Sequence, residues 1–382
     1  MIKDGGALAK RIHEALEFAG RQLRRLVSAH PDFFPMYTRN GKWKHSGEAW
    51  TNWCEGFLGG QLWLMHSYTG DRWWRDRAVH YSRLIEQRKA DDTVHDLGFL
   101  FWSTWKRWYD LSPEGFIDDV LVEAGRTAGS RFRAKGGYLP SFVSAESTFI
   151  DIMMNVGIIF YAARQSKDET LWEGAAKHCE TTRRYLVRGD GSVAHEGIFD
   201  TEAGEFLRGT THQGWRDDSS WARGLTWAIY GFGTAFRFTG NSRFLHTAEA
   251  CAAFYIQHTP AHGVPPNDWA EPDPAYPHES SAAAIAASAF LQLSELTADS
   301  VRAAMYRQYA LRILDTLLEP RFLANDTPNW EGILKRGIYH QSRGLGVDES
   351  VMWGDYFLLE ALVDALHVLR DPTAAGSARP RC

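Results

Sequence analysis

The stretch Gly56-Phe57-Leu58-Gly59-Gly60-Gln61-Leu62-Trp63-Leu64-Met65, followed by Thr69-Gly70-Asp71 and a charged segment at residues 72–88, indicates how the whole chain folds. The first segment is apolar on all sides, which is typical of a helix that is buried all round. The second segment is charged on one face, as a helix with one face in water is. Gly and Asp stop and restart helices, so we predict a helical hairpin with one buried and one amphipathic member.

The same two-part pattern recurs along the chain, with an apolar segment, a short polar turn and a charged segment. It covers residues 96–132, 151–186, 221–257 and 280–318. A final apolar segment at residues 351–369 has no charged segment after it, and the amphipathic segment at residues 1–20 supplies one. No stretch of comparable length alternates strictly between apolar and polar residues, so we expect no competing strand.

These pairs predict an all-α fold, an α/α toroid (six-hairpin barrel). The apolar helices would form an inner ring and the amphipathic helices an outer ring around it. Because one repeated unit fills the chain, we expect residues 1–382 to form a single α/α-barrel catalytic domain. Residues from about 373 to 382 would be a flexible tail.

Composition excludes several classes of protein. Of the 382 residues, 44% are hydrophobic, the formal net charge is -5, and Lys and Arg are scattered, which argues against nucleic-acid and membrane-surface partners. The cysteines stand apart from one another, as reduced thiols in the cytoplasm do. No apolar run approaches the ~18 residues of a membrane span. We therefore expect a cytoplasmic protein that is a monomer or a small homo-oligomer.

Long connections lead into the inner helices and suggest where a site lies. They cover residues 29–52, 133–148, 187–218, 258–279 and 319–349. Long loops in a compact domain are usually functional. All the inner helices run in the same direction, so these loops meet at one rim, where helix N-termini favour anions.

Acids, imidazoles, an arginine and aromatic side chains gather at that rim. They are Trp50, Trp53, His95, Asp96, Asp151, His212, Gln213, Arg223, Trp227, Asn267, Asp268, His278, Glu279, His340, Asp348 and Glu349. This mixture suits a sugar acid. Two carboxylates can divide acid and base work if their surroundings separate their pKa values. Asp151 precedes apolar residues and is the better proton donor, whereas Asp96 beside His95 would more easily remain ionised.

Each candidate also has a structural interpretation. Asp96 and Asp151 both fit Thr-x-x-Asp, a variant of the capping box. Arg223 and Trp227 lie one helical turn apart and could be a buried packing or cation–π pair. Lone histidines such as His195 are more often hydrogen-bonded structural residues than ligands. No set of His, Asp and Glu has metal-ligand spacing, so we expect no metal and no cofactor.

Several segments, taken together and in order, resemble the unsaturated glucuronyl hydrolases. They are His95-Asp96-Leu97-Gly98-Phe99, Asp151-Ile152-Met153-Met154-Asn155, His212-Gln213-Gly214, Trp221-Ala222-Arg223-Gly224 with Trp227, Ser280-Ser281-Ala282, and Gly344-Leu345-Gly346-Val347-Asp348-Glu349-Ser350. The resemblance spans almost the whole chain. It implies a six-hairpin α/α barrel and a metal-free bacterial enzyme of the cytoplasm. Such enzymes act on unsaturated disaccharides that lyases release from chondroitin, hyaluronan, heparin or gellan-type polymers.

The resemblance also implies roles for individual residues. Asp151 would protonate C4 of the 4,5-unsaturated uronic acid and then act as the base for the water that adds at C5. Asp96 matches the second acid of the family and would orient or stabilise the reacting groups. The remaining matches surround the substrate: His95, His195, Gln213 and Arg223 lie around the unsaturated ring, and Trp53 and Trp227 offer stacking surfaces.

The sequence departs from the family pattern at two places, and three alternative functions stay open. Trp50-Thr51-Asn52 also resembles the segment that begins at Trp53, so the stacking tryptophan is ambiguous, and Glu279 stands where we expect Asp. An unsaturated rhamnogalacturonyl hydrolase would use the same scaffold. An α/α-barrel sugar epimerase would need catalytic histidines, and a sugar-binding protein would bind without forming product.

Overall fold

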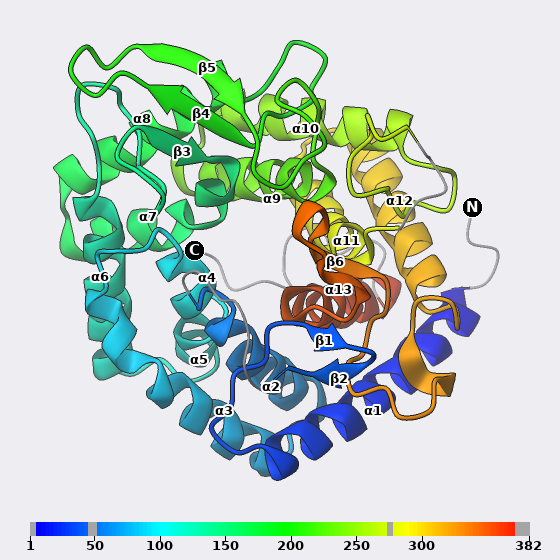
Figure 1. Cartoon of the computed structure of the whole chain (residues 1–382). Helices are drawn as coiled ribbons and strands as arrows, with labels where there is room; N and C mark the ends of the chain where they lie inside the picture. Colours follow the sequence, from blue (N-terminus) through cyan, green and yellow to red (C-terminus); the bar gives the residue numbers. More distant parts are fainter. Residues whose placement is uncertain (1–4, 45–51, 273–277, 371–382) are drawn as a thin grey trace.

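The computed structural model describes residues 5–44, 52–272 and 278–370, and its helices close into a double ring (Figure 1). The inner ring consists of α2 (Glu55–Thr69), α4 (Leu97–Phe101) with α5 (Trp105–Leu111), α7 (Val156–Ser166), α9 (Ala222–Thr239), α11 (Ser280–Leu296) and α13 (Met352–Arg370). The outer ring consists of α1 (Gly5–Ala29), α3 (Arg72–Leu84), α6 (Gly115–Ser130), α8 (Glu169–Tyr185), α10 (Ser242–His258) and α12 (Ser300–Leu317). The predicted α/α toroid is confirmed.

Burial separates the two rings as the sequence predicts. In α11 every residue from Ser280 to Ser294 is buried, whereas α12 buries only part of its surface and exposes residues such as Val301. The N-terminal helix α1 packs against α13, so the first and last helices close the ring. The predicted tail lies outside the described residues.

The second inner helix differs from the prediction of one continuous helix. It is interrupted between α4 and α5, where the hydroxyl groups of Ser103 and Thr104 donate to the carbonyl oxygens of Phe99 and Leu100, both at 2.5 Å. Such bonds from Ser and Thr to carbonyls four residues earlier compete with the helix and bend it. The third inner helix also starts differently, with the 3₁₀ turn η2 (Ile150–Met154) ahead of α7.

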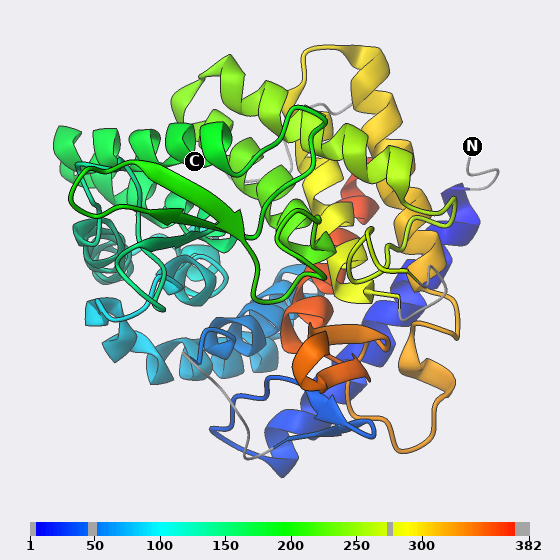
Figure 2. The same cartoon turned by 45° about the horizontal axis from the view of Figure 1, so that its top comes forward.

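Short strands, which we did not expect, lie within the long connections. In the described part of the chain they pair antiparallel into three sheets: β1 (Thr38–Arg39) with β2 (Lys42–Trp43), β3 (Ser147–Phe149) with β4 (Glu196–Phe199) and β5 (Phe206–Thr210), and β6 (Gly337–His340) with β7 (Leu345–Glu349). Strands this short carry no readable alternation. Figures 1 and 2 show them together at one end of the ring. β3 runs directly into η2, and β7 is the last strand before α13.

Helices α6 and α7 approach closely at Gly125. A Cβ atom built there would lie 2.3 Å from the carbonyl oxygen of Ile158 and 2.4 Å from Cβ of Ala162. By contrast, a Cβ built on Gly115, at the start of α6, would meet nothing within 4 Å. Gly125 therefore sets the distance between the outer helix α6 and the inner helix α7, which follows η2.

We expect Gly125→Ala to destabilise the fold, because the added methyl group overlaps backbone atoms that cannot move freely. Overpacking of this kind costs about 1–3 kcal/mol. Gly115→Ala is the matched control in the same helix and should leave stability unchanged or slightly raised. Urea unfolding followed by circular dichroism measures both changes, and equal stabilities for the two variants would contradict the expectation.

Candidate active site

A cavity of about 220 Å³ opens at the end of the ring where the sheets lie. Its wall combines acids, imidazoles, cations and aromatic rings. The lining residues are Trp53, His95, Asp96, Phe99, Phe142, Val143, Phe149, Asp151, His212, Gln213, Arg223, Tyr339, His340 and Arg343. The toroid thus gathers side chains from distant segments around one hollow.

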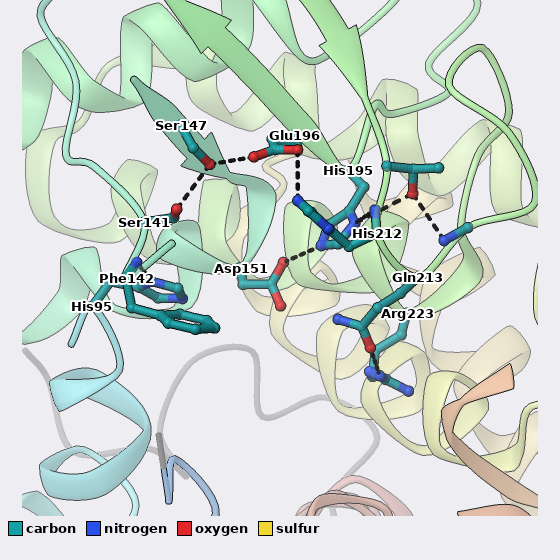
Figure 3. Close-up of polar contacts among 12 residues, drawn as sticks. His95, Ser141, Phe142, Ser147, Asp151, His195, Glu196, His212, Gln213 and Arg223 are labelled. Carbon is teal, nitrogen blue, oxygen red and sulfur yellow. Dashed lines mark hydrogen bonds and ion pairs between the residues drawn. The ribbon is translucent and has the colours of Figure 1, made fainter. Parts of the chain in front are cut away.

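Asp151 is held at this cavity by the sheet that precedes it. It is the second residue of η2, directly after β3, and the N–H of Ile150 donates to the carbonyl of His195 at 2.9 Å. That bond continues the β3–β4 pairing and brings His195 beside Asp151 (Figure 3). The residue in the capping position of η2 is Phe149, so Asp151 is not the helix cap that its sequence pattern also allowed.

Asp96 lies on the neighbouring inner segment and is buried. It occupies the capping position of α4, yet its side chain makes no capping hydrogen bond. Asn155 ties the two acid-bearing segments together. Its side-chain oxygen accepts the N–H of Phe99 at 3.0 Å, and its amide donates to the carbonyl of Asp151 at 3.2 Å. Gly98 permits this approach, because a Cβ there would lie 2.5 Å from Cα of Asn155.

Each acid faces a buried imidazole in the same way. The N–H of Phe142 donates to Nδ1 of His95 at 3.1 Å, and Nε2 of His95 lies 3.2 Å from Asp96. Likewise the N–H of His212 donates to Nδ1 of His195 at 3.1 Å, and Nε2 of His195 lies 3.6 Å from Asp151. A ring nitrogen that accepts a hydrogen bond leaves the proton on the other one. Both neutral imidazoles therefore present an N–H to a carboxyl group.

Burial keeps these imidazoles neutral and brings the pKa of Asp151 close to neutrality. Burial lowers the pKa of His95 to about 3 and lowers the pKa of His195 well below its ordinary value. Burial also raises the pKa of Asp151 from 3.8 to about 7; the Arg223 cation opposes this shift and the Asp96 carboxylate adds to it. Its side chain is 15% exposed. A carboxyl with this pKa can give and take a proton near neutrality.

Arg223 and Gln213 form the adjacent part of the wall. Arg223 is buried, donates to the carbonyl of Tyr339 at 2.9 Å and to the side-chain oxygen of Gln213 at 2.6 Å, and also donates to the carbonyl of Ile338. Its guanidinium lies 4.3 Å from the ring of Trp221. The structure therefore brings Gln213 and Arg223 together with both acids, as the sequence predicts.

The two candidate stacking tryptophans differ in position. Trp53 lines the cavity and packs on Trp353, with ring centroids 4.7 Å apart. Trp227 is fully buried and packs beneath Phe99, with ring centroids 5.1 Å apart. Trp227 does not line the cavity, so the expected stacking surface at this position is corrected. Trp50 lies outside the described residues.

Some acids predicted at the rim instead hold loops in place. Glu279 is buried and accepts the first N–H groups of α11 and the N–H of Ile338 at 3.1 Å. Asp268 accepts the N–H of Trp215 at 2.9 Å, and Glu349 accepts N–H groups from the β1–β2 turn. Conversely, Phe142, Tyr339, Arg343 and the buried Glu196 belong to the site or its support and had no motif to reveal them.

The described residues contain no group of three or more His, Cys, Asp or Glu side chains placed to hold a metal ion. Over the same residues, none of the helices is long and apolar enough to cross a membrane.

The pH dependence of stability tests the burial of Asp151. Its folded-state pKa exceeds its unfolded value, so its contribution to stability is present below about pH 4 and is lost as the pH rises toward 7. We expect Asp151→Asn to remove this loss, with a gain in unfolding free energy above pH 7 of at most about 4 kcal/mol at ~1.4 kcal/mol per pKa unit. Urea titrations at a series of pH values measure the difference, and one that does not grow with pH would contradict the burial argument.

No protein-family model matches the chain. An unsaturated glucuronyl hydrolase of Formosa agariphila is 34% identical over 320 residues, which are 81% of this chain and 79% of that protein. The crystal structure of an unsaturated glucuronyl hydrolase from Bacillus sp. GL1, described as responsible for the degradation of glycosaminoglycan, is 31% identical. It covers 92% of this chain and 96% of its own, with a TM-score of 0.86.

A further solved structure, an unsaturated glucuronyl hydrolase specific for heparin, has a TM-score of 0.88 at 27% identity and covers 94% of this chain and 98% of its own. Sequence similarity and fold therefore agree. The chain belongs to the unsaturated glucuronyl hydrolases.

Proposed function

We propose that this chain hydrolyses unsaturated disaccharides left by polysaccharide lyases and releases the 4,5-unsaturated uronic acid from their non-reducing end. The observation that carries the proposal is Asp151, a carboxyl group with a pKa of about 7 at the wall of a cavity that also holds cations and aromatic rings. The membership of this chain in the unsaturated glucuronyl hydrolases supports the same activity. The named substrates of the two structural relatives point to the glycosaminoglycan class.

The proposed reaction begins with a proton transfer from Asp151 to C4 of the enol ether. The resulting positive charge at C5 is shared with the ring oxygen, and water adds at C5 while the Asp151 carboxylate takes its proton. Asp151 thus returns to its starting state. The hemiketal opens to a ketone at C5, and C1 then expels the aglycone sugar, so that cleavage follows from hydration of the double bond.

The surrounding groups fit supporting roles in this scheme. We infer that Asp96, which faces the N–H of His95, orients reacting groups and stabilises developing positive charge. His195 presents its N–H to Asp151 and would stabilise the carboxylate after proton transfer. Gln213 and Arg223 would bind the uronate, and Trp53 would stack on a sugar ring. Trp227 would act only by supporting Phe99.

We further infer a single catalytic domain that works in the cytoplasm without metal or cofactor, as a monomer or small homo-oligomer. The scattered basic residues and isolated cysteines support this interpretation. Proton transfer by Asp151 supplies the chemistry without a Lewis acid.

Substituting Asp151→Asn tests the assignment, because the amide cannot donate a proton to carbon. We expect loss of at least about a thousandfold in turnover, within the range that general acid–base groups contribute. Asp119→Asn on the exposed face of α6 is the matched control and should retain native turnover. The assay follows the ultraviolet absorbance of the C4=C5 bond, and unchanged turnover in Asp151→Asn would remove Asp151 from the mechanism.

Mass spectrometry of the products separates the alternatives. Glycosaminoglycan-derived and pectin-derived disaccharides are supplied side by side. Preferred cleavage of the pectin-derived substrate would indicate a rhamnogalacturonyl hydrolase, an isomer of unchanged mass would indicate an epimerase, and saturable binding without product would indicate a sugar-binding protein.

A further inference from the structure

A buried chain of hydrogen bonds lies behind His212 on the cavity wall (Figure 3). The hydroxyl of Ser141 donates to that of Ser147 at 2.8 Å, and the hydroxyl of Ser147 donates to the carboxylate of Glu196. The other carboxylate oxygen of Glu196 lies 3.0 Å from Nε2 of His212. None of the roles proposed above uses Glu196.

Each hydroxyl group in this series of hydrogen bonds donates to the next group in the direction of Glu196. Ser141 itself accepts the N–H of Val143 at 3.2 Å, so its own proton is directed to Ser147. Ser147 donates to one carboxylate oxygen of Glu196, so the other oxygen can accept from His212. The side chain of Glu196 is only 3% exposed. A buried carboxylate needs such donors and a cationic partner.

His212 is the partner that reaches the cavity. Its side chain is 48% exposed, and it lines the same hollow as Asp151 and Arg343. With Nε2 turned to Glu196, the other ring nitrogen makes no hydrogen bond to any residue that the structure describes. A protonated His212 therefore has an N–H available for a ligand.

The charge environment favours the protonated form. The hydrogen bond from His212 to Glu196 raises the pKa of this imidazole, against partial burial. Asp217 also raises it and Arg343 lowers it. The opposite holds for the neighbouring imidazoles of His195 and His340, whose pKa values burial lowers. The charged and titratable groups around His212 are thus Glu196, Asp217, Arg343, His195 and His340.

We propose that Glu196 is a positioning residue that holds His212 as a cation against the carboxylate of the bound unsaturated uronic acid. The inference rests on the proposed function and adds a binding group to it. Arg223, the neighbouring cation, is 2% exposed and donates to three oxygens of the protein itself. His212 is more exposed and can approach the substrate directly, while Arg223 contributes from behind Gln213.

The test is the pH dependence of KM for an unsulfated unsaturated disaccharide, whose anionic group is the uronate. For the native chain we expect KM to rise about tenfold as the pH rises through the pKa of His212, the equivalent of one charge interaction of ~1.4 kcal/mol. Removing the carboxylate charge lowers that pKa. Glu196→Gln should therefore show a raised KM at neutral pH, an inflection at lower pH and a kcat within about threefold of native.

Two further variants separate positioning from structure. Glu196→Asp keeps the charge and should restore the inflection toward its native pH. Ser147→Ala removes one donor to Glu196 but leaves the carboxylate, so it should move the inflection less than Glu196→Gln does. An inflection that is the same in native and Glu196→Gln chains would overturn the proposal. So would a KM effect confined to a sulfated disaccharide, because it would assign His212 to the sulfate.

An NMR titration of the His212 imidazole keeps this inference distinguishable from the proposed function. If the native chain turns over no unsaturated disaccharide, the proposed function fails, but the titration still measures whether Glu196 holds the proton on His212. A pKa for His212 that Glu196→Gln leaves unchanged would overturn the positioning role on its own.

Discussion

A helix that is apolar on every side is stable in water only when other elements surround it, and this constraint shapes the whole molecule. Helices such as α11 bury their full circumference, so the inner helices must pack on one another and be covered by an outer layer. Closing the ring through α1 and α13 removes the last exposed edge. Since the inner helices run in parallel, their N-terminal ends and the loops before them meet at one end, where the cavity lies.

The same burial that stabilises the ring makes its mouth chemically useful. Asp151 lies in η2, directly after β3, among apolar neighbours, and loss of water moves its pKa toward neutrality. Taking a carboxyl group out of water costs free energy unless it is partnered. The imidazole of His195 lies close enough to respond when the charge forms, and Asn155 holds the backbone of Asp151 in place. Burial of the Asp151 carboxyl group thus both suits it to proton transfer and lowers local stability.

Sequence patterns located both catalytic candidates but could not decide between two explanations of them. Thr-x-x-Asp fits a helix cap as well as an active-site acid. Only the structure shows that Asp96, although at the cap position of α4, makes no capping hydrogen bond, and that Phe149 and not Asp151 occupies the cap position of η2. Glu279 shows the reverse case, because it was placed at the rim and proves to be a buried cap. Trp227 resembles the family at its position, yet it is fully buried and does not line the cavity. Residue identity does not reveal what a neighbouring helix covers.

The sequence alone determined the repeated helical hairpins, the order of inner and outer helices, the family and the acids of the cavity. These follow from periodicity and from motifs that are local in the chain. Only the tertiary structure decided the small sheets, the tautomers of His95 and His195, and the link from Ser147 through Glu196 to His212. These features depend on contacts between separate segments, which lie 49 residues apart for Ser147 and Glu196 and 17 residues apart for His195 and His212. Strand register and burial bring such residues together, and neither leaves a periodic mark in the sequence.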